Sequence, residues 1–233
     1  MKTIYVFDLG GVLINLNVAR CMRAFEALMG ETNMRAILGM DSNGEGVKAV
    51  SVATKQLMMD FEKGLISAEQ FISEVLHYCH PGTTRQDVID AWMSMLGNLP
   101  AEKLQFIDSL RAQGHPVYLL SNGNDLHFDY INRTDTLDSH FDGLFLSQRL
   151  HLSKPDPQIY LTVQESIHAS LLPSLQGEEL RSIGGPVDVH RTHGGRPLPQ
   201  IIFVDDILAN RFAAEQTVHW RTFSYLAELS SAL

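Results

Sequence analysis

Several polar side chains that can do chemistry follow short apolar runs of the 233-residue chain. They are Asp8 after residues 4–7, Ser121 and Asn122 after 116–120, Lys154 after 143–146, and Asp205 with Asp206 after 201–204. Apolar runs of this length predict buried parallel strands, whose carboxyl ends meet at one edge of a sheet. Carboxylates there can hold Mg²⁺, and hydroxyl, backbone N–H and lysine groups can bind phosphate oxygens. The pattern therefore predicts a phosphoryl-transfer site.

The elements that must position these side chains alternate along the chain. The sequence predicts strands at 4–7, 116–120, 143–146, 201–204 and 218–223, and helices at 100–112, 125–133, 158–169 and 207–216. Strands separated by helices are typical of an α/β fold, here a Rossmann-like, doubly wound parallel sheet. Gly10 and Gly11 follow the first strand and would let the backbone approach a ligand closely.

The segment between the first two strands has only helical patterning. Apolar spacing predicts helices at 17–29, around 57–61, after a capping box at Ser67 and from Thr84 onward. We therefore expect a core of residues 1–15 and 100–233, with a helical cap inserted at 16–99. Residues 173–199 are rich in Gly and Pro and predict a peripheral loop insertion, at the sheet edge away from the carboxylates.

Composition narrows the range of partners. The net charge of −9 and the lack of a basic run disfavour nucleic acid and anionic membranes, and no apolar stretch is long enough to span a bilayer. A phosphorylated small-molecule substrate remains compatible, because a bound metal reverses the local field. Cys21 and Cys79 form no disulfide framework, which favours a cytoplasmic protein. A monomer and a homodimer are both left open.

Four motifs resemble those of the haloacid dehalogenase-like (HAD) hydrolase superfamily. They are residues 8–12 (DLGGV), 119–122 (LLSN), 154–155 (KP) and 203–206 (FVDD). The helical insert resembles the first cap class of the superfamily. Residues 61–67 and 121–127 are also similar to bacterial α-glucose-1-phosphate phosphatases and to the N-terminal phosphatase domain of soluble epoxide hydrolase.

The resemblance assigns roles to the strand-end residues. It implies that Asp8 is the nucleophile and becomes an aspartyl phosphate. It implies phosphate binding by Ser121, Asn122 and Lys154, with Lys154 also neutralising Asp8. It further implies Mg²⁺ bound by Asp8, the Gly10 backbone carbonyl, Asp206 directly, and Asp205 in the inner or second coordination shell.

Gly10 is a departure from most phosphatases of the superfamily. They carry a second Asp at this position, two residues after the nucleophile, as general acid and base. Such proton transfer is typically worth about 10²–10⁴-fold. The resembled sugar-1-phosphatases share the glycine, and an anomeric oxygen is a good leaving group. His127, on the segment after Ser121, is a candidate proton relay.

Three functions follow from these residues. The first is Mg²⁺-dependent hydrolysis of a small cytosolic phosphomonoester, such as a sugar phosphate, through an aspartyl phosphate. The alternatives are a metal-independent 2-haloacid dehalogenase and a catalytically weak phosphate-ligand-binding protein. The adjacent Asp205 and Asp206 oppose the dehalogenase, because paired carboxylates serve a cation and halide displacement needs none.

Overall fold

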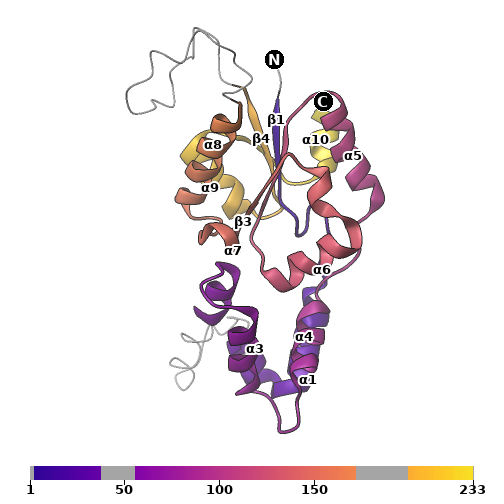
Figure 1. The fold of residues 1–233 in the computed structure, drawn as a ribbon, viewed down its shortest axis with the longest axis vertical. Helices are drawn as coiled ribbons and strands as arrows, with labels where there is room; N and C mark the ends of the chain where they lie inside the picture. Colours follow the sequence, from indigo (N-terminus) through magenta and orange to yellow (C-terminus); the bar gives the residue numbers. More distant parts are fainter. Residues whose placement is uncertain (1–2, 38–55, 172–198, 233) are drawn as a thin grey trace.

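A single parallel sheet forms the centre of the molecule. The computed structural model describes residues 3–37, 56–171 and 199–232 (Figure 1). The strands are β1 (Ile4–Phe7), β2 (Val117–Ser121), β3 (Gly143–Leu146), β4 (Ile201–Val204) and β5 (Arg221–Phe223). They pair in parallel in the order β3-β2-β1-β4-β5, which places β1 in the middle. This order confirms the predicted doubly wound α/β fold.

Helices cover both faces of the sheet. Alternate residues of β1 point to opposite sides, so Tyr5 and Phe7 join one hydrophobic cluster and Ile4 and Val6 the other. The first cluster includes side chains of α5 (Ala101–Ala112), α6 (Asp125–Asp135) and α10 (Leu226–Ala232). The second includes side chains of α8 (Pro157–Leu171) and α9 (Leu208–Val218). Figure 1 shows these two helical layers on either side of the strands.

The described part of the cap consists of helices with a hydrophobic cluster of their own. Its elements are α1 (Val18–Ile37), a helix over 56–62, α3 (Ala68–Leu76) and α4 (Arg85–Met93). Ser67 and Thr84 begin α3 and α4 with reciprocal capping boxes. The cluster contains Cys21, Phe25, Met29, Met34, Phe61, Phe71, Ile72, Val75, Val88, Ala91 and Trp92. The division into core and cap stays a prediction, which this separate cluster supports.

Two antiparallel segments connect the cap to the core. Leu16 and Leu96 form an antiparallel bridge, and Asn17 N–H donates to the Met95 carbonyl over 2.7 Å. Gly97 N–H donates to the Asn15 carbonyl over 2.8 Å, and a Cβ on Gly97 would lie 2.6 Å from that oxygen. This close approach explains the glycine. Entry and exit of the cap therefore form one narrow ribbon.

Local differences from the sequence-based prediction lie at short elements. The backbone leaves helical geometry at Gly30 (φ 78°, ψ 161°) as predicted, but helix resumes and continues to Ile37. The helices η1 (Leu137–His140), α7 (Ser147–Leu150) and α10 have one or two turns, too few for a clear apolar period. The predicted loop insertion at 173–199 lies almost wholly outside the described residues.

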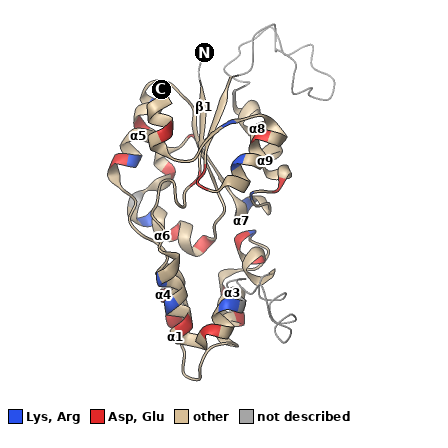
Figure 2. Ribbon diagram, turned by 180° about the vertical axis from the view of Figure 1, so that it is seen from behind, with Lys and Arg blue, Asp and Glu red and all other residues tan. Residues whose placement is uncertain are grey.

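The surface chemistry of the described helices is mixed. Both acidic and basic residues are found on the helices of cap and core (Figure 2). Among the described residues, no helix has the length and apolar character needed to cross a membrane.

A stacked pair of rings joins α4 of the cap to α6 of the core. The rings of Trp92 and His127 lie 5.1 Å apart at 12°. His127 Nε2 lies 3.2 Å from the Trp92 carbonyl, and its Nδ1 lies 3.3 Å from Asn124 Nδ2. These contacts suit a neutral ring that donates from Nε2 and accepts at Nδ1. Burial lowers the pKa of His127 to about 4.

This junction makes folding stability depend on pH. Because the folded pKa of His127 lies below its ordinary value, the unfolded chain takes up the proton first. The contribution of the neutral His127 ring to the free energy of unfolding is complete above pH ~6.5 and is lost as the pH falls toward 4. From pH 7 to pH 5, we expect the free energy of unfolding of the wild type to fall by about 2 kcal/mol more than that of His127→Phe. Urea denaturation at both pH values measures this, and equal decreases for variant and wild type would contradict it.

Candidate active site

A buried lysine lies between two carboxylates at the carboxyl edge of the sheet. Lys154 Nζ is 2.9 Å from Asp8 Oδ1 and 2.6 Å from Asp205 Oδ2. Asp8 directly follows β1, and Asp205 directly follows the neighbouring strand β4. All three side chains are almost fully buried. The fold thus brings three of the predicted site residues into direct contact.

The loop that carries Lys154 is held by Asn122, just after β2. The Asn122 amide donates to the Lys154 carbonyl and accepts from the Lys154 N–H, both over 2.8 Å. Lys154 Nζ also donates to the Leu120 carbonyl of β2 over 3.0 Å. The Asn122 side chain, predicted to bind phosphate, is therefore engaged in positioning Lys154.

Asp205 is enclosed by donors that the sequence analysis missed. Asn210 Nδ2 lies 3.1 and 3.0 Å from the two carboxylate oxygens, and Ile207 N–H donates to Oδ1 over 2.9 Å. Tyr160 donates to the Asn210 carbonyl over 2.9 Å. With Lys154 bound as well, both oxygens of Asp205 are occupied. A sequence signal existed, since Asn210 stands five residues after Asp205, in the first turn of α9.

Asp206 lies against the glycine turn after β1 and is less buried than Asp205. Gly11 has φ +75°, and a Cβ on it would lie 2.2 Å from Asp206 Oδ2. Only glycine leaves room for this carboxylate in that conformation. Arg211 fixes the backbone on the other side, donating to the carbonyls of Asp205 and Asp206 over 2.6 and 3.0 Å.

The electrostatics of the site follow from burial. Desolvation raises the pKa of Asp8, opposed by the Lys154 ammonium. Burial alone would lower the pKa of Lys154, but the charges of Asp8 and Asp205 outweigh it, so the pKa is raised. Desolvation and the neighbouring Asp205 raise the pKa of Asp206. The site therefore holds an excess of mutually repelling negative charge.

The three carboxylates of the site can together hold a metal ion. Ligand oxygens of Asp8, Asp205 and Asp206 all lie within 4.8 Å of one another. Oxygen donors of this kind suit Mg²⁺, and one lysine against three carboxylates leaves two negative charges for a divalent cation to neutralise. The donor set fits the metal. Because Asp205 already receives hydrogen bonds on both oxygens, Asp8 and Asp206 offer the freer ligand atoms.

Ser121 ends β2 beside this cluster. In the parallel register Phe7 of β1 pairs with Leu119 of β2. Asp8 is one residue past Phe7 and Ser121 is two residues past Leu119, so both stand at the carboxyl ends of neighbouring strands. Ser121 is buried, and its hydroxyl contacts the Asn122 carbonyl at 3.3 Å. The loop that follows Ser121 is bound to the residue after β3, because Gly123 N–H donates to Ser147 Oγ over 3.0 Å.

His127 belongs to the junction between cap and core. Both of its ring nitrogens have partners there, Asn124 and Trp92, and the structure records no contact with Asp8. Its role as a proton relay stays a prediction.

Relatives of known structure share this architecture. A HAD family enzyme from Bacteroides thetaiotaomicron, solved with magnesium and inorganic phosphate, is 23% identical, with a TM-score of 0.68 over 96% of this chain and 94% of the other. A predicted HAD-like family hydrolase from Porphyromonas gingivalis is 27% identical, with a TM-score of 0.66 over 100% and 98% of the two chains.

Sequence comparisons lead to the same family. A D-ribitol-5-phosphate phosphatase from Bacteroides thetaiotaomicron is 26% identical over 161 residues, which cover 66% of this chain and 72% of the relative. The finer resemblance to glucose-1-phosphate phosphatases and to the epoxide hydrolase domain stays a prediction. The family model for haloacid dehalogenase-like hydrolases matches residues 2–171, and the chain belongs to that family.

Proposed function

We propose that this protein hydrolyses a small phosphorylated sugar or polyol, with Mg²⁺ as cofactor and Asp8 as nucleophile. The observation that carries the proposal is the pairing of Asp8 with Lys154 beside Asp205 and Asp206, at the end of the central strand. The relative that acts on D-ribitol 5-phosphate supports a polyol phosphate as the substrate class.

Asp8 is suited to attack phosphorus. Its Oδ1 is held by the Leu9 N–H at 2.7 Å and by Lys154 at 2.9 Å. The carboxylate forms a bond to phosphorus while the alcohol leaves, giving an aspartyl phosphate that water then hydrolyses. Ser121 and Lys154 would bind the phosphoryl oxygens during both steps.

The predicted metal ligands are Asp8, the Gly10 carbonyl, Asp206 and Asp205, and we propose that Asp205 stands behind the other three. Bound Mg²⁺ would neutralise charge between the nucleophile and the phosphoryl group, whose mutual repulsion otherwise opposes attack. Asn210 and Lys154 saturate Asp205, which supports its place in the second shell. Gly11 leaves the space in which Asp206 stands.

The cluster also bears on the alternative chemistry. Solved dehalogenases with 18–19% identity share the fold with this chain, which does not assign their reaction to it. A halide-displacing enzyme has no need for a convergent set of three carboxylates. The geometry therefore favours phosphoryl transfer over the metal-independent 2-haloacid dehalogenase.

The first prediction concerns the nucleophile and the metal. Asp8→Asn should abolish measurable hydrolysis of phosphomonoesters with the fold retained, because an amide cannot form the acyl phosphate. EDTA should abolish wild-type activity, and Mg²⁺ should restore it. Colorimetric phosphate release measures both, with the exposed Asp129→Asn as a control. Full activity in EDTA, or phosphate trapped on a residue other than Asp8, would contradict the proposal.

The second prediction compares the two adjacent glycines. Gly11→Ala should cost about 1–2 kcal/mol for the left-handed backbone alone and should displace Asp206, weakening Mg²⁺ activation at least tenfold. Gly10→Ala is the matched control, since its Cβ would meet only the side chain of Leu16, which is 42% exposed and can move. Titration of activity with Mg²⁺ tests this. Equal Mg²⁺ requirements in the two variants would contradict it.

The third prediction concerns the position at which most phosphatases of the family carry an acid. Gly10 is free of left-handed strain, so Gly10→Asp should fold. A carboxyl there should raise turnover of simple alkyl phosphates by at most about 10²–10⁴-fold, because such leaving groups need a proton. Aryl phosphates should change less. Comparing kcat on both classes with Gly10→Asn, which matches the size without the acid, isolates proton transfer, and equal changes in both variants would refute it.

A further inference from the structure

A lysine outside the carboxylate cluster binds the turn that follows β1. Lys103 Nζ donates a hydrogen bond to the Val12 carbonyl over 2.6 Å, so its partner is a neutral backbone group and not a carboxylate. The side chain is partly buried, and burial lowers the pKa of its ammonium, opposed by the charge of Glu102. Withdrawal of a charge from water costs free energy unless hydrogen bonds replace the lost hydration. The bond to Val12 is therefore more than the incidental contact of a solvated side chain.

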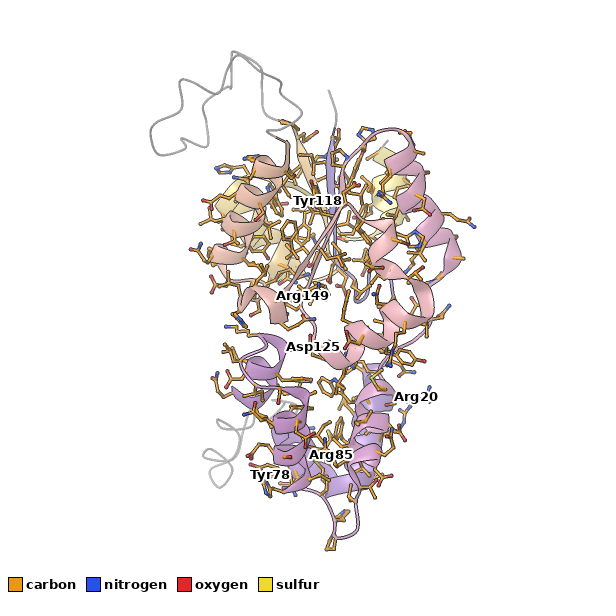
Figure 3. The ribbon with its side chains drawn as sticks, in the orientation of Figure 1. Arg20, Tyr78, Arg85, Tyr118, Asp125 and Arg149 are labelled. Carbon is orange, nitrogen blue, oxygen red and sulfur yellow. The ribbon has the colours of Figure 1, made fainter. Side chains whose placement is uncertain are left out.

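Lys103 stands at the end of its helix that faces the site. It lies in the first turn of α5 and reaches the turn after β1, whereas Arg111, in the last turn of α5, donates to the Ser139 carbonyl, which precedes β3. The carboxyl ends of the strands point toward the cap, since Figure 3 shows Tyr118 within the sheet and Asp125, beyond the end of β2, at the boundary with the cap. α5 therefore carries one cation at the carboxyl edge of the sheet and another at the opposite edge.

The Val12 carbonyl is part of a chain of hydrogen bonds that ends at Asp8. It shares a peptide group with the Leu13 N–H, which donates to the Leu9 carbonyl over 2.9 Å. The Leu9 N–H in turn donates to Asp8 Oδ1 over 2.7 Å. A charged donor makes a stronger hydrogen bond than a neutral one, and it polarises the peptide group that accepts it. Lys103 is therefore connected, through the backbone of Val12 and Leu9, to the carboxylate proposed as nucleophile.

The same turn, residues 9–14, forms part of the predicted Mg²⁺ site. It carries the Gly10 carbonyl, and it carries Gly11, on which a Cβ would lie 2.2 Å from Asp206 Oδ2. The turn is closed by the Gly11 N–H, which donates to the Ile14 carbonyl over 2.9 Å. Before a cation binds, the carboxylates of the cluster repel one another, and two adjacent glycines give the backbone little stiffness of its own. A bond from outside the cluster would keep the turn closed in the metal-free protein.

We propose that Lys103 is a positioning residue for the Mg²⁺ site, because its bond to Val12 holds the turn at 9–14 in the conformation that binds the metal. In that conformation Gly11 leaves room for Asp206 beside the turn. In this assignment the lysine touches neither metal nor substrate and acts through the backbone. The inference rests on the proposed function for the identity of the metal, whereas the effect on the turn can be measured without metal or substrate.

Lys103→Met tests the assignment in the intact chain. Methionine keeps most of the apolar stem but cannot donate a hydrogen bond. Calorimetric titration with Mg²⁺ in the absence of substrate should give a Kd about tenfold higher than that of the wild type, as expected for loss of one charged hydrogen bond. Coulomb attraction alone has the opposite sign, because removal of a cation would tighten Mg²⁺ binding. Lys103→Arg keeps the charge and the donors and should restore the affinity to within about threefold.

Arg111 supplies a matched control on the same helix. It donates from Nη1 to the Ser139 carbonyl over 2.8 Å and pairs with Asp142 at 3.0 Å. Arg111→Met removes one positive charge and a bond to a carbonyl, as Lys103→Met does, but at the far end of α5. It should lower Tm and leave the Mg²⁺ affinity unchanged. A difference in Mg²⁺ affinity between the two variants therefore reports on the turn and not on net charge or overall stability.

Amide exchange measures the turn itself. The amides of Leu13 and Ile14 both donate to the Leu9 carbonyl, over 2.9 and 2.8 Å. In the metal-free protein, hydrogen–deuterium exchange of these two amides should be about tenfold faster in Lys103→Met than in the wild type, because the turn opens more often. Arg111→Met should not show this local increase.

The outcomes distinguish the two proposals. Faster exchange together with weaker Mg²⁺ binding supports the positioning role even if the wild type hydrolyses no phosphomonoester, a result that would overturn only the proposed function. Unchanged or tighter Mg²⁺ binding by Lys103→Met would overturn the positioning role, as would unchanged exchange of the two amides or a wild type that binds no Mg²⁺. Equal weakening in Lys103→Met and Lys103→Arg would trace the effect to packing of the stem and overturn it as well.

Discussion

The whole site depends on one buried ammonium between two carboxylates. Lys154 neutralises Asp8 and Asp205, which lie on neighbouring strands and would otherwise repel each other in a site closed to water. Removal of the lysine would leave two buried charges uncompensated, so we regard it as both a structural and a chemical group. The parallel sheet makes this arrangement possible. The paired strands β1 and β4 end side by side and carry the two carboxylates, and the segment that follows β3 carries Lys154. The backbone of that loop is in turn tied to β2 by Asn122.

Much of the fold follows from local sequence. Four-residue runs predicted β1, β3 and β4 to the residue; β1 and β4 are buried throughout, and a buried strand has no polar face that blurs its ends. The capping boxes at Ser67 and Thr84 fixed the starts of two cap helices for a similarly local reason. The continuation of α1 beyond Gly30 could not be predicted, since glycine normally ends a helix and only packing of residues such as Met34 in the cap cluster favours its resumption.

The site was predictable in its residue types but not in its connections. Strand ends predicted Asp8, Ser121, Asp205 and Asp206, and the segment after β3 predicted Lys154, because the topology of a parallel sheet brings such positions together. Nothing in residue spacing reveals that Asn122 turns toward the backbone of Lys154, or that Asn210 reaches back to Asp205. These contacts depend on tertiary geometry. Gly11 is intermediate: the glycine pair signals a close approach, but only the structure identifies Asp206 as the group that approaches.

The cap and the core meet through groups that are polar and not interchangeable. Trp92 and His127 form one contact, and the turn at 62–64 forms another on α7, so the cap is held at two places besides its connecting ribbon. The hydrogen bonds from His127 and from Ser147 at these contacts are partly buried, and burial makes a hydrogen bond more costly to leave unmade. Gln148, whose buried amide makes no hydrogen bond to a described residue, carries such a cost at this junction. The carboxylates and Lys154 would contact only the phosphoryl group, which all phosphomonoesters share, so we infer that selectivity among substrates comes from residues outside this cluster.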